Sequence, residues 1–189
     1  MIDNKKVAII DCDDVIMGFK KLMCEALNRH TGKTVHCEQW TTYNVIEFYD
    51  DLALDDFYKV IIENELLKKG EPNENVRETI LKLKEMGYHI VIITSRAYHP
   101  NAEELTKQWM EKHRIPYDDI HVSGNGIKKS SCAKIYKNIE FVIDDNLDNL
   151  IDFEVNSNAK KLFLVDQPWN RNDTRYIRIT NMNEIFNHL

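Results

Sequence analysis

The sequence lacks the features that mark membrane, secreted and thiolate-metal proteins. No apolar run is long enough to span a bilayer, and the opening residues MIDNKKVAII lack the apolar segment of a signal peptide. The four cysteines are scattered without CxxC spacing, so paired disulfides are not expected. His36 and Cys37 are adjacent, but further ligands at metal-binding spacing are missing. We therefore expect a reduced, cytoplasmic protein with no membrane partner.

Basic residues are also in the minority. Lys and Arg number 25 against 31 Asp and Glu, which gives a formal net charge of −6. A protein that binds nucleic-acid polymers needs a basic face for the phosphate backbone, so that partner is not expected. A small anionic substrate remains compatible, because a bound cation can invert the local field.

What is present is the composition of a globular domain. The chain has 189 residues, of which 43% are hydrophobic and 30% are charged, and it shows no repeat, low-complexity tract or obvious linker. This length allows one domain with a real core and a small insertion. The oligomeric state does not follow from the sequence, which leaves a homodimer open.

Short runs rich in Ile and Val predict the strands of a parallel sheet. They are VAIID, YHIVIITS, DIHVSG, IEFVIDD and KKLFLV. Helical patterns lie between them: one ends at Gly87, one follows Pro100, and one opens at Ser130 or Ser131, which are good N-caps. Strands that alternate with helices predict a doubly wound, three-layer α/β/α fold.

Residues 16–71 break this alternation, because they are mostly helical and contain no good strand. We interpret them as a helical cap subdomain inserted after the first strand, with residues 1–15 and 72–189 forming the α/β core. The cap would lie above the end of the sheet where ligands bind in such folds. Helices that only complete the core are the alternative.

Polar side chains follow the carboxyl ends of the predicted strands, which meet at one edge of a parallel sheet. A single site is therefore expected there. A lone DxD is a weak signal, but an acid cluster, a hydroxyl, a lysine and an acid pair, in that order and each after an apolar strand, form a strong one. The residues at these ends are Asp11, Asp13 and Asp14; Thr94, Ser95 and Arg96; Lys128 and Lys129; Asp144 and Asp145; and Asp166, Trp169, Asn170 and Arg171.

These residue types suit phosphoryl transfer. Asp11 and Asp144 can supply oxygens to Mg²⁺, the hard divalent cation that we expect here. Asp11 can also attack phosphorus and form an aspartyl phosphate, while Asp13 can protonate the leaving oxygen and later activate water. Thr94 and Ser95 can hold phosphate oxygens, and a lysine can neutralise the charge on the transferred group.

Three lysines lie in the right interval for that role. Lys134 would be more than one helical turn from the sheet edge. Lys128 and Lys129 lie at the junction of loop and helix, where an ammonium can reach the phosphate. We predict Lys129 as the phosphate lysine, with Lys128 as the second candidate.

At these residues the chain resembles the haloacid-dehalogenase-like (HAD) phosphohydrolases. DCDDV from Asp11 matches the family's first motif, of nucleophile then acid/base, Thr94 matches the second, and Asp144-Asp145 matches the fourth. The resemblance implies a HAD-like Rossmannoid core. It also implies that the metal is held by Asp11, Asp144 and Asp145, and by Asp13 through its backbone carbonyl.

Nearly the whole chain is similar to the 5′(3′)-deoxyribonucleotidases and their bacterial and phage relatives. The helical insertion agrees, LVDQPWNR resembles their LFDxPxN stretch, and Phe19 occupies the position of their base-stacking Phe. The resemblance implies magnesium-dependent hydrolysis of a nucleoside monophosphate to nucleoside and phosphate.

The chain departs from that family at two positions. Asp14 replaces a Gly, and we expect its loss to spare the chemistry. Arg96 replaces a Pro, and we expect it to bind substrate and alter the substrate preference, because Arg is a good phosphate or carboxylate partner. In the cap, Trp40 and Tyr43 are candidates to flank a base, although packing inside the insertion would explain them equally.

Other functions remain open at this stage. The same chemistry could act on another small phosphomonoester, such as a sugar phosphate. A receiver module of a signalling pathway also has acids, a Thr and a Lys. It carries its acidic pair on the first strand, its accepting Asp on a middle strand and no helical insertion, whereas this chain has DxD first and its acid pair after the lysine. A catalytically silent binding protein is disfavoured, because every expected catalytic residue type is present.

Overall fold

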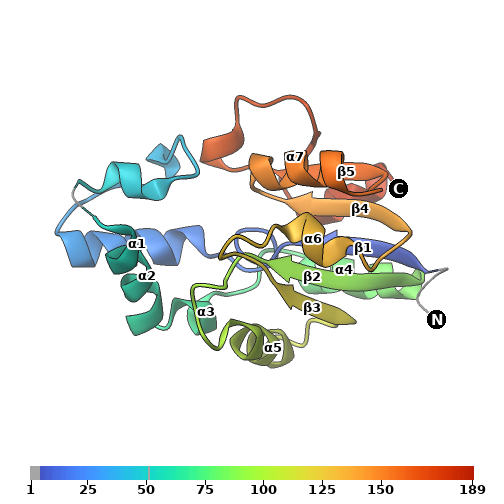
Figure 1. Cartoon of the computed structure of the whole chain (residues 1–189), viewed down its shortest axis with the longest axis horizontal. Coiled ribbons are helices and arrows are strands. Elements are labelled where there is room, and N and C mark those ends of the chain that lie inside the picture. Colours follow the sequence, from blue (N-terminus) through green and yellow to red (C-terminus); the bar gives the residue numbers. More distant parts are fainter. Residues whose placement is uncertain (1–4, 51) are drawn as a thin grey trace.

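The computed structural model describes residues 5–50 and 52–189, in which a twisted parallel sheet is covered by helices on both faces (Figure 1). The sheet order is β3-β2-β1-β4-β5-β6, and every neighbouring pair is parallel. The strands are β1 (Lys6–Ile10), β2 (Tyr88–Thr94), β3 (Asp119–Val122), β4 (Ile139–Asp144), β5 (Lys161–Val165) and β6 (Ile177–Ile179). The predicted doubly wound α/β/α fold is confirmed.

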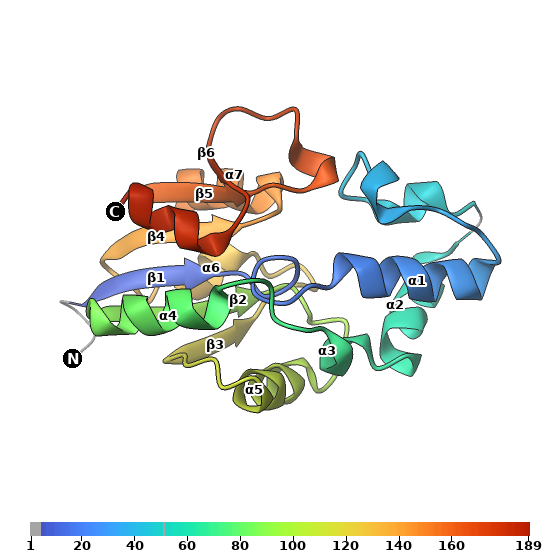
Figure 2. The same ribbon diagram turned by 180° about the vertical axis from the view of Figure 1, so that it is seen from behind.

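The central strands are apolar on both sides because helices cover both faces. Helices α6 (Lys129–Ala133) and α7 (Leu147–Asn156) cover the face seen in Figure 1. Helix α4 (Val76–Glu85) and the 3₁₀ helix η4 (Met182–Asn187) cover the opposite face, seen in Figure 2, and α5 (Ala102–Lys112) packs at the β3 edge. The predicted stop of α4 at Gly87 agrees with its left-handed φ of 85°.

One sequence-based expectation for the core needs correction, and one strand was missed. The helix expected to open at Ser130 or Ser131 begins at Lys129, because Asp152 on α7 accepts the Ser130 N–H at 3.3 Å and supplies the cap from outside. Strand β6 was not predicted, because three residues are too short for a periodic pattern.

The segment between β1 and α4 is helical in the residues described. It holds α1 (Lys20–Thr31), η1 (Cys37–Gln39), η2 (Val45–Phe48), α2 (Leu54–Glu63) and α3 (Leu66–Lys69). These elements lie beyond the carboxyl ends of the strands in both views (Figures 1 and 2). The predicted domain ranges remain a prediction, and their residues 1–4 and 51 lie outside the described part of the chain. None of the described helices is long and apolar enough to cross a membrane.

Candidate active site

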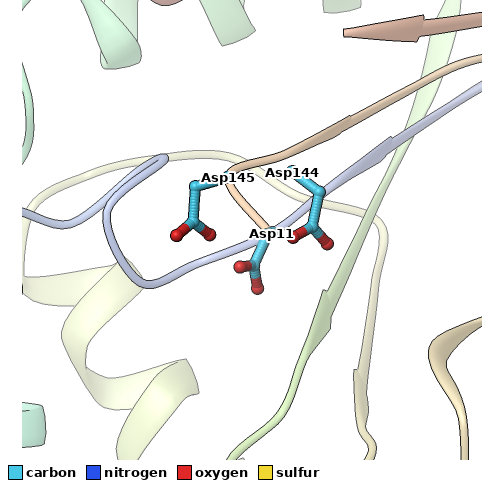
Figure 3. Close-up of side chains that lie close together, drawn as sticks. All are labelled: Asp11, Asp144 and Asp145. Carbon is cyan, nitrogen blue, oxygen red and sulfur yellow. The ribbon is translucent and has the colours of Figure 1, made fainter. Parts of the chain in front are cut away.

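Three carboxylates converge at the carboxyl end of the central strands. Asp11 follows β1, Asp144 ends β4, and Asp145 comes next, so the parallel pairing of β1 with β4 brings the three together (Figure 3). One oxygen from each lies within 4.8 Å of the other two, and all three residues are buried.

Lys129 is the ammonium that faces this cluster. Its Nζ lies 2.8 Å from Asp11 Oδ1 and 2.7 Å from Asp144 Oδ2, and the side chain is 2% exposed. Burial by itself would lower the pKa of Lys129, but the two carboxylates hold it above its usual value. The other candidates lie elsewhere: Lys134 is exposed, and Lys128 is 69% exposed and pairs with Asp152 at 3.3 Å.

The cluster is electrostatically strained and suits a divalent cation. Burial raises the pKa of Asp11 to about 7. The Lys129 ammonium lowers this pKa, whereas the carboxylates of Asp144 and Asp13 raise it. Burial also raises the pKa of Asp145 well above its usual value. Three buried carboxylates with one ammonium leave a net negative charge in an all-oxygen donor set, which is what Mg²⁺ prefers.

The hydroxyl expected from the second motif lies at the end of β2. Thr94 is fully buried, and its Oγ1 has no hydrogen-bond partner within residues 5–50 and 52–189. A buried hydroxyl is costly unless it makes a hydrogen bond, which suits a group that binds a substrate oxygen. Ser95 is exposed, lines the cavity described below, and lies with its Oγ 3.1 Å from that of Ser123.

Asp13 faces the cavity but is held by Arg96. The Arg96 Nε donates to Asp13 Oδ2 at 2.8 Å, and its second terminal nitrogen donates to Oδ1. Arg96 is fully buried and does not line the cavity, so its guanidinium binds a carboxylate of the protein in this structure.

Asp14 supports the backbone of the loop. Its Oδ1 accepts the N–H groups of Phe19 at 3.0 Å and Lys20 at 2.7 Å, which fixes the entry into α1. Its φ of 57° is left-handed, a conformation that Asp tolerates better than most residues. Burial raises the pKa of its carboxyl to about 7.

A cavity of about 390 Å³ opens above these residues, between the inserted segment and the core. Asp13, Asp145 and Ser95 line it from the core. Phe19 and Tyr43 line it as well, whereas Trp40 is fully buried and packs edge-on against Tyr49 away from the cavity. Other aromatic residues that line it were not predicted: they are Phe57, Tyr58, Tyr98 and Trp169, the last of which appeared only among the strand-end residues.

Amide side chains orient the acids, and of these the sequence analysis missed Asn149 and Gln167. Asn149 donates to both oxygens of Asp144, at 3.1 and 3.2 Å. Asn170 donates to the backbone carbonyl of Asp145 at 2.8 Å, and Gln167 donates to that of Asp14 at 3.3 Å. Only Asn170 had a signal, because it follows a predicted strand.

Solved structures with the same fold support the architecture. A HAD-superfamily hydrolase of Geobacter sulfurreducens superposes with a TM-score of 0.64 at 13% identity, over 99% of this chain and 98% of that one. CbbY of Rhodobacter sphaeroides, solved with phosphate, gives a TM-score of 0.66 at 13% identity over 96% of each chain. The chain therefore has the fold of the HAD-like hydrolases.

The sequence comparisons go further. Residues 5–189 match the family described as 5′ nucleotidase, deoxy (pyrimidine), cytosolic type C. The 5′(3′)-deoxyribonucleotidases of Bacillus subtilis and of Bacillus phage SPbeta are each 28% identical over 178 residues, which is 92% of this chain and 81% of theirs. The chain belongs to this nucleotidase family and is a phosphoric monoester hydrolase, as the resemblance of its motifs implied.

Proposed function

We propose that the chain hydrolyses nucleoside monophosphates, among them deoxynucleotides, to a nucleoside and inorganic phosphate. The observation that carries the proposal is the aromatic-lined cavity directly above a buried acid–lysine cluster. Its volume of about 390 Å³ lies in the range of small-ligand sites. Phe19 and Tyr43 offer apolar faces to a base, and the curated relatives are named for deoxyribonucleotides.

In the first step Asp11 is the nucleophile. A carboxylate oxygen of Asp11 forms a bond to phosphorus while the bond from phosphorus to the ester oxygen breaks. Asp13 gives its proton to that oxygen, and the nucleoside leaves as an alcohol. The product is an aspartyl phosphate on Asp11.

In the second step water attacks the phosphorus of this intermediate. Asp13 takes a proton from the water, the bond between phosphorus and Asp11 breaks, and phosphate is released with both carboxyl groups restored. In this proposal the Lys129 ammonium and the Thr94 hydroxyl bind the oxygens that gain charge, which is supported by their burial beside Asp11 and at the end of β2.

Mg²⁺ fits the site described above, with Asp11, Asp144 and Asp145 as ligands and Asp13 as a carbonyl donor. When bound it would offset the negative charge of the cluster and of the phosphate. The carboxylate oxygens within 4.8 Å of one another support this ligand set.

The test is phosphate release over a panel of mononucleotides and sugar phosphates, with Mg²⁺ or with EDTA. We expect turnover of nucleotides with Mg²⁺ and its loss in EDTA. Asp11→Asn should be inactive, and a ³²P label should appear on wild type only. A preference for sugar phosphates would refute the nucleotide assignment, and turnover by Asp11→Asn would refute the aspartyl phosphate.

A further inference from the structure

Arg96 binds the carboxylate of Asp13, the proposed acid/base, from the side facing the protein interior. Two nitrogens of its guanidinium donate to the two oxygens of Asp13, with Nε to Oδ2 at 2.8 Å. The two residues lie 83 positions apart, on the loops that follow β1 and β2. The pair therefore joins two strand ends of the active site.

The other side of the guanidinium is also fixed. Arg96 Nη1 donates to Thr106 Oγ1 at 2.9 Å, and that hydroxyl donates to the Ala102 carbonyl at 2.7 Å within α5. Met17 Sδ lies 3.8 Å from Nη2. Arg96 is fully buried, so helix α5 and the loop after β1 together hold its planar fork in one orientation.

This arrangement constrains Asp13 without closing it off. The carboxylate lines the cavity, and its side chain remains 24% exposed. A bidentate Arg contact occupies one lone pair on each oxygen and removes the free rotation of the carboxylate. The remaining lone pairs face away from the guanidinium, where an ester oxygen would have to lie for proton transfer.

We propose that Arg96 is a positioning residue that aligns Asp13 with the leaving oxygen and thereby sets its proton transfer. The inference rests on the proposed function and deepens it. It differs from the sequence-based expectation that Arg96 binds substrate. The guanidinium binds Asp13 and does not line the cavity, so it would act on the substrate only by orienting Asp13.

The leaving group provides the test. Departure of p-nitrophenolate needs little protonation, whereas an alkoxide needs a proton as the ester bond breaks. The rate to compare is that of leaving-group release in the first turnover, because the later attack of water uses Asp13 as a base with either ester. We expect Arg96→Lys, which keeps the charge and loses the fork, to lower this first-turnover rate about 10-fold or more on the alkyl phosphate that the panel ranks first. On p-nitrophenyl phosphate the first-turnover rate should fall less than about 2-fold, since general-acid help is not needed in that step. The substrate concentration that gives half of the maximal rate should change little for both esters. Asp13→Asn should show the same substrate pattern, and adding Arg96→Lys to it should cost little more, because the two residues act as one unit.

A second pair of variants guards against misfolding of Arg96→Lys. Thr106→Val removes the hydroxyl that holds the fork, whereas Thr106→Ser retains it. We expect the selective loss on the alkyl phosphate in Thr106→Val to exceed that in Thr106→Ser. Equal losses of the first-turnover rate on both substrates across these variants, or losses that follow only the melting temperature, would show a structural role. Either result would overturn the inference while leaving the hydrolase intact. A wild-type protein that hydrolyses neither ester would overturn the proposed function as well.

Discussion

Replacing Lys129 by Met tests the centre of the site. In the structure its ammonium is the cation between Asp11 and Asp144, at 2.8 and 2.7 Å. Loss of one preorganised charge in an active site costs about 2.7–4 kcal/mol, so kcat should fall by about 10²–10³-fold. Stability should also fall, by up to about 3–5 kcal/mol when a buried charge loses its partner, and by less where the acids can take up protons.

Lys128→Met is the matched control, one position away. Its side chain is 69% exposed and pairs with Asp152 at 3.3 Å, so it should cost at most about 1 kcal/mol and leave kcat within about 2-fold. Phosphate release at saturating substrate gives kcat, and urea unfolding gives the free energy of unfolding. A fully active Lys129→Met, or an inactive Lys128→Met that is folded, would refute the assignment of the phosphate lysine.

Three further predictions concern stability and the cap. In metal-free protein, the free energy of unfolding of wild type relative to that of Asp11→Asn should rise as the pH falls from about 8 to about 5. The reason is that the folded pKa of Asp11, about 7, lies above its unfolded value, so the folded state takes up a proton first. Unfolding curves with and without Mg²⁺ measure this, and a difference between the two proteins that does not change with pH would contradict it. Asp14→Ala should lose about 0.5–2 kcal/mol of stability, because the carboxylate that caps α1 is removed, and it should retain kcat. Asp14→Asn should lose less stability. Abolished turnover in a folded Asp14→Asn would contradict a purely structural role for Asp14. Tyr58 on α2 stacks on Tyr98, in the loop after β2, with 4.6 Å between the ring centres. Tyr58→Leu should raise KM up to about 10-fold, because the lost stacking weakens substrate binding by about 0.5–1.5 kcal/mol. Initial rates at a series of substrate concentrations measure KM, and an unchanged KM would exclude a role for this stack in binding.

The sequence allowed the sheet and most of the cluster to be predicted, because both depend on local patterns. Apolar runs marked β1 to β5, and the parallel topology then required Asp11, Thr94 and Asp144 to meet. The start of α6 was misplaced, because its cap comes from Asp152 on another helix. A local reading of caps cannot include such a partner.

The orientation of long side chains could not be predicted from the sequence, because it also depends on distant parts of the chain. Arg96 after a strand end suits a substrate phosphate or a carboxylate equally. Only the folded chain shows that its guanidinium binds Asp13 and is held by Thr106 on α5. Trp40 and Tyr43 are three residues apart in an irregular segment, where no periodicity tells which ring faces the cavity. Orientation in such a segment depends on tertiary contacts alone.

The hydrogen bond from Gln167 to Asp14 closes a loop of 153 residues, and it has a consequence for how the enzyme matures. The loop that carries Gln167 and Asn170 braces both acidic segments, yet it is made long after the nucleophile has been synthesised. During translation the central strands can pair while the catalytic loops still lack this support. Activity should therefore appear only after residue 170 has left the ribosome. A shorter nascent chain would contain Asp11, Lys129 and Asp144 but would not yet hydrolyse substrate.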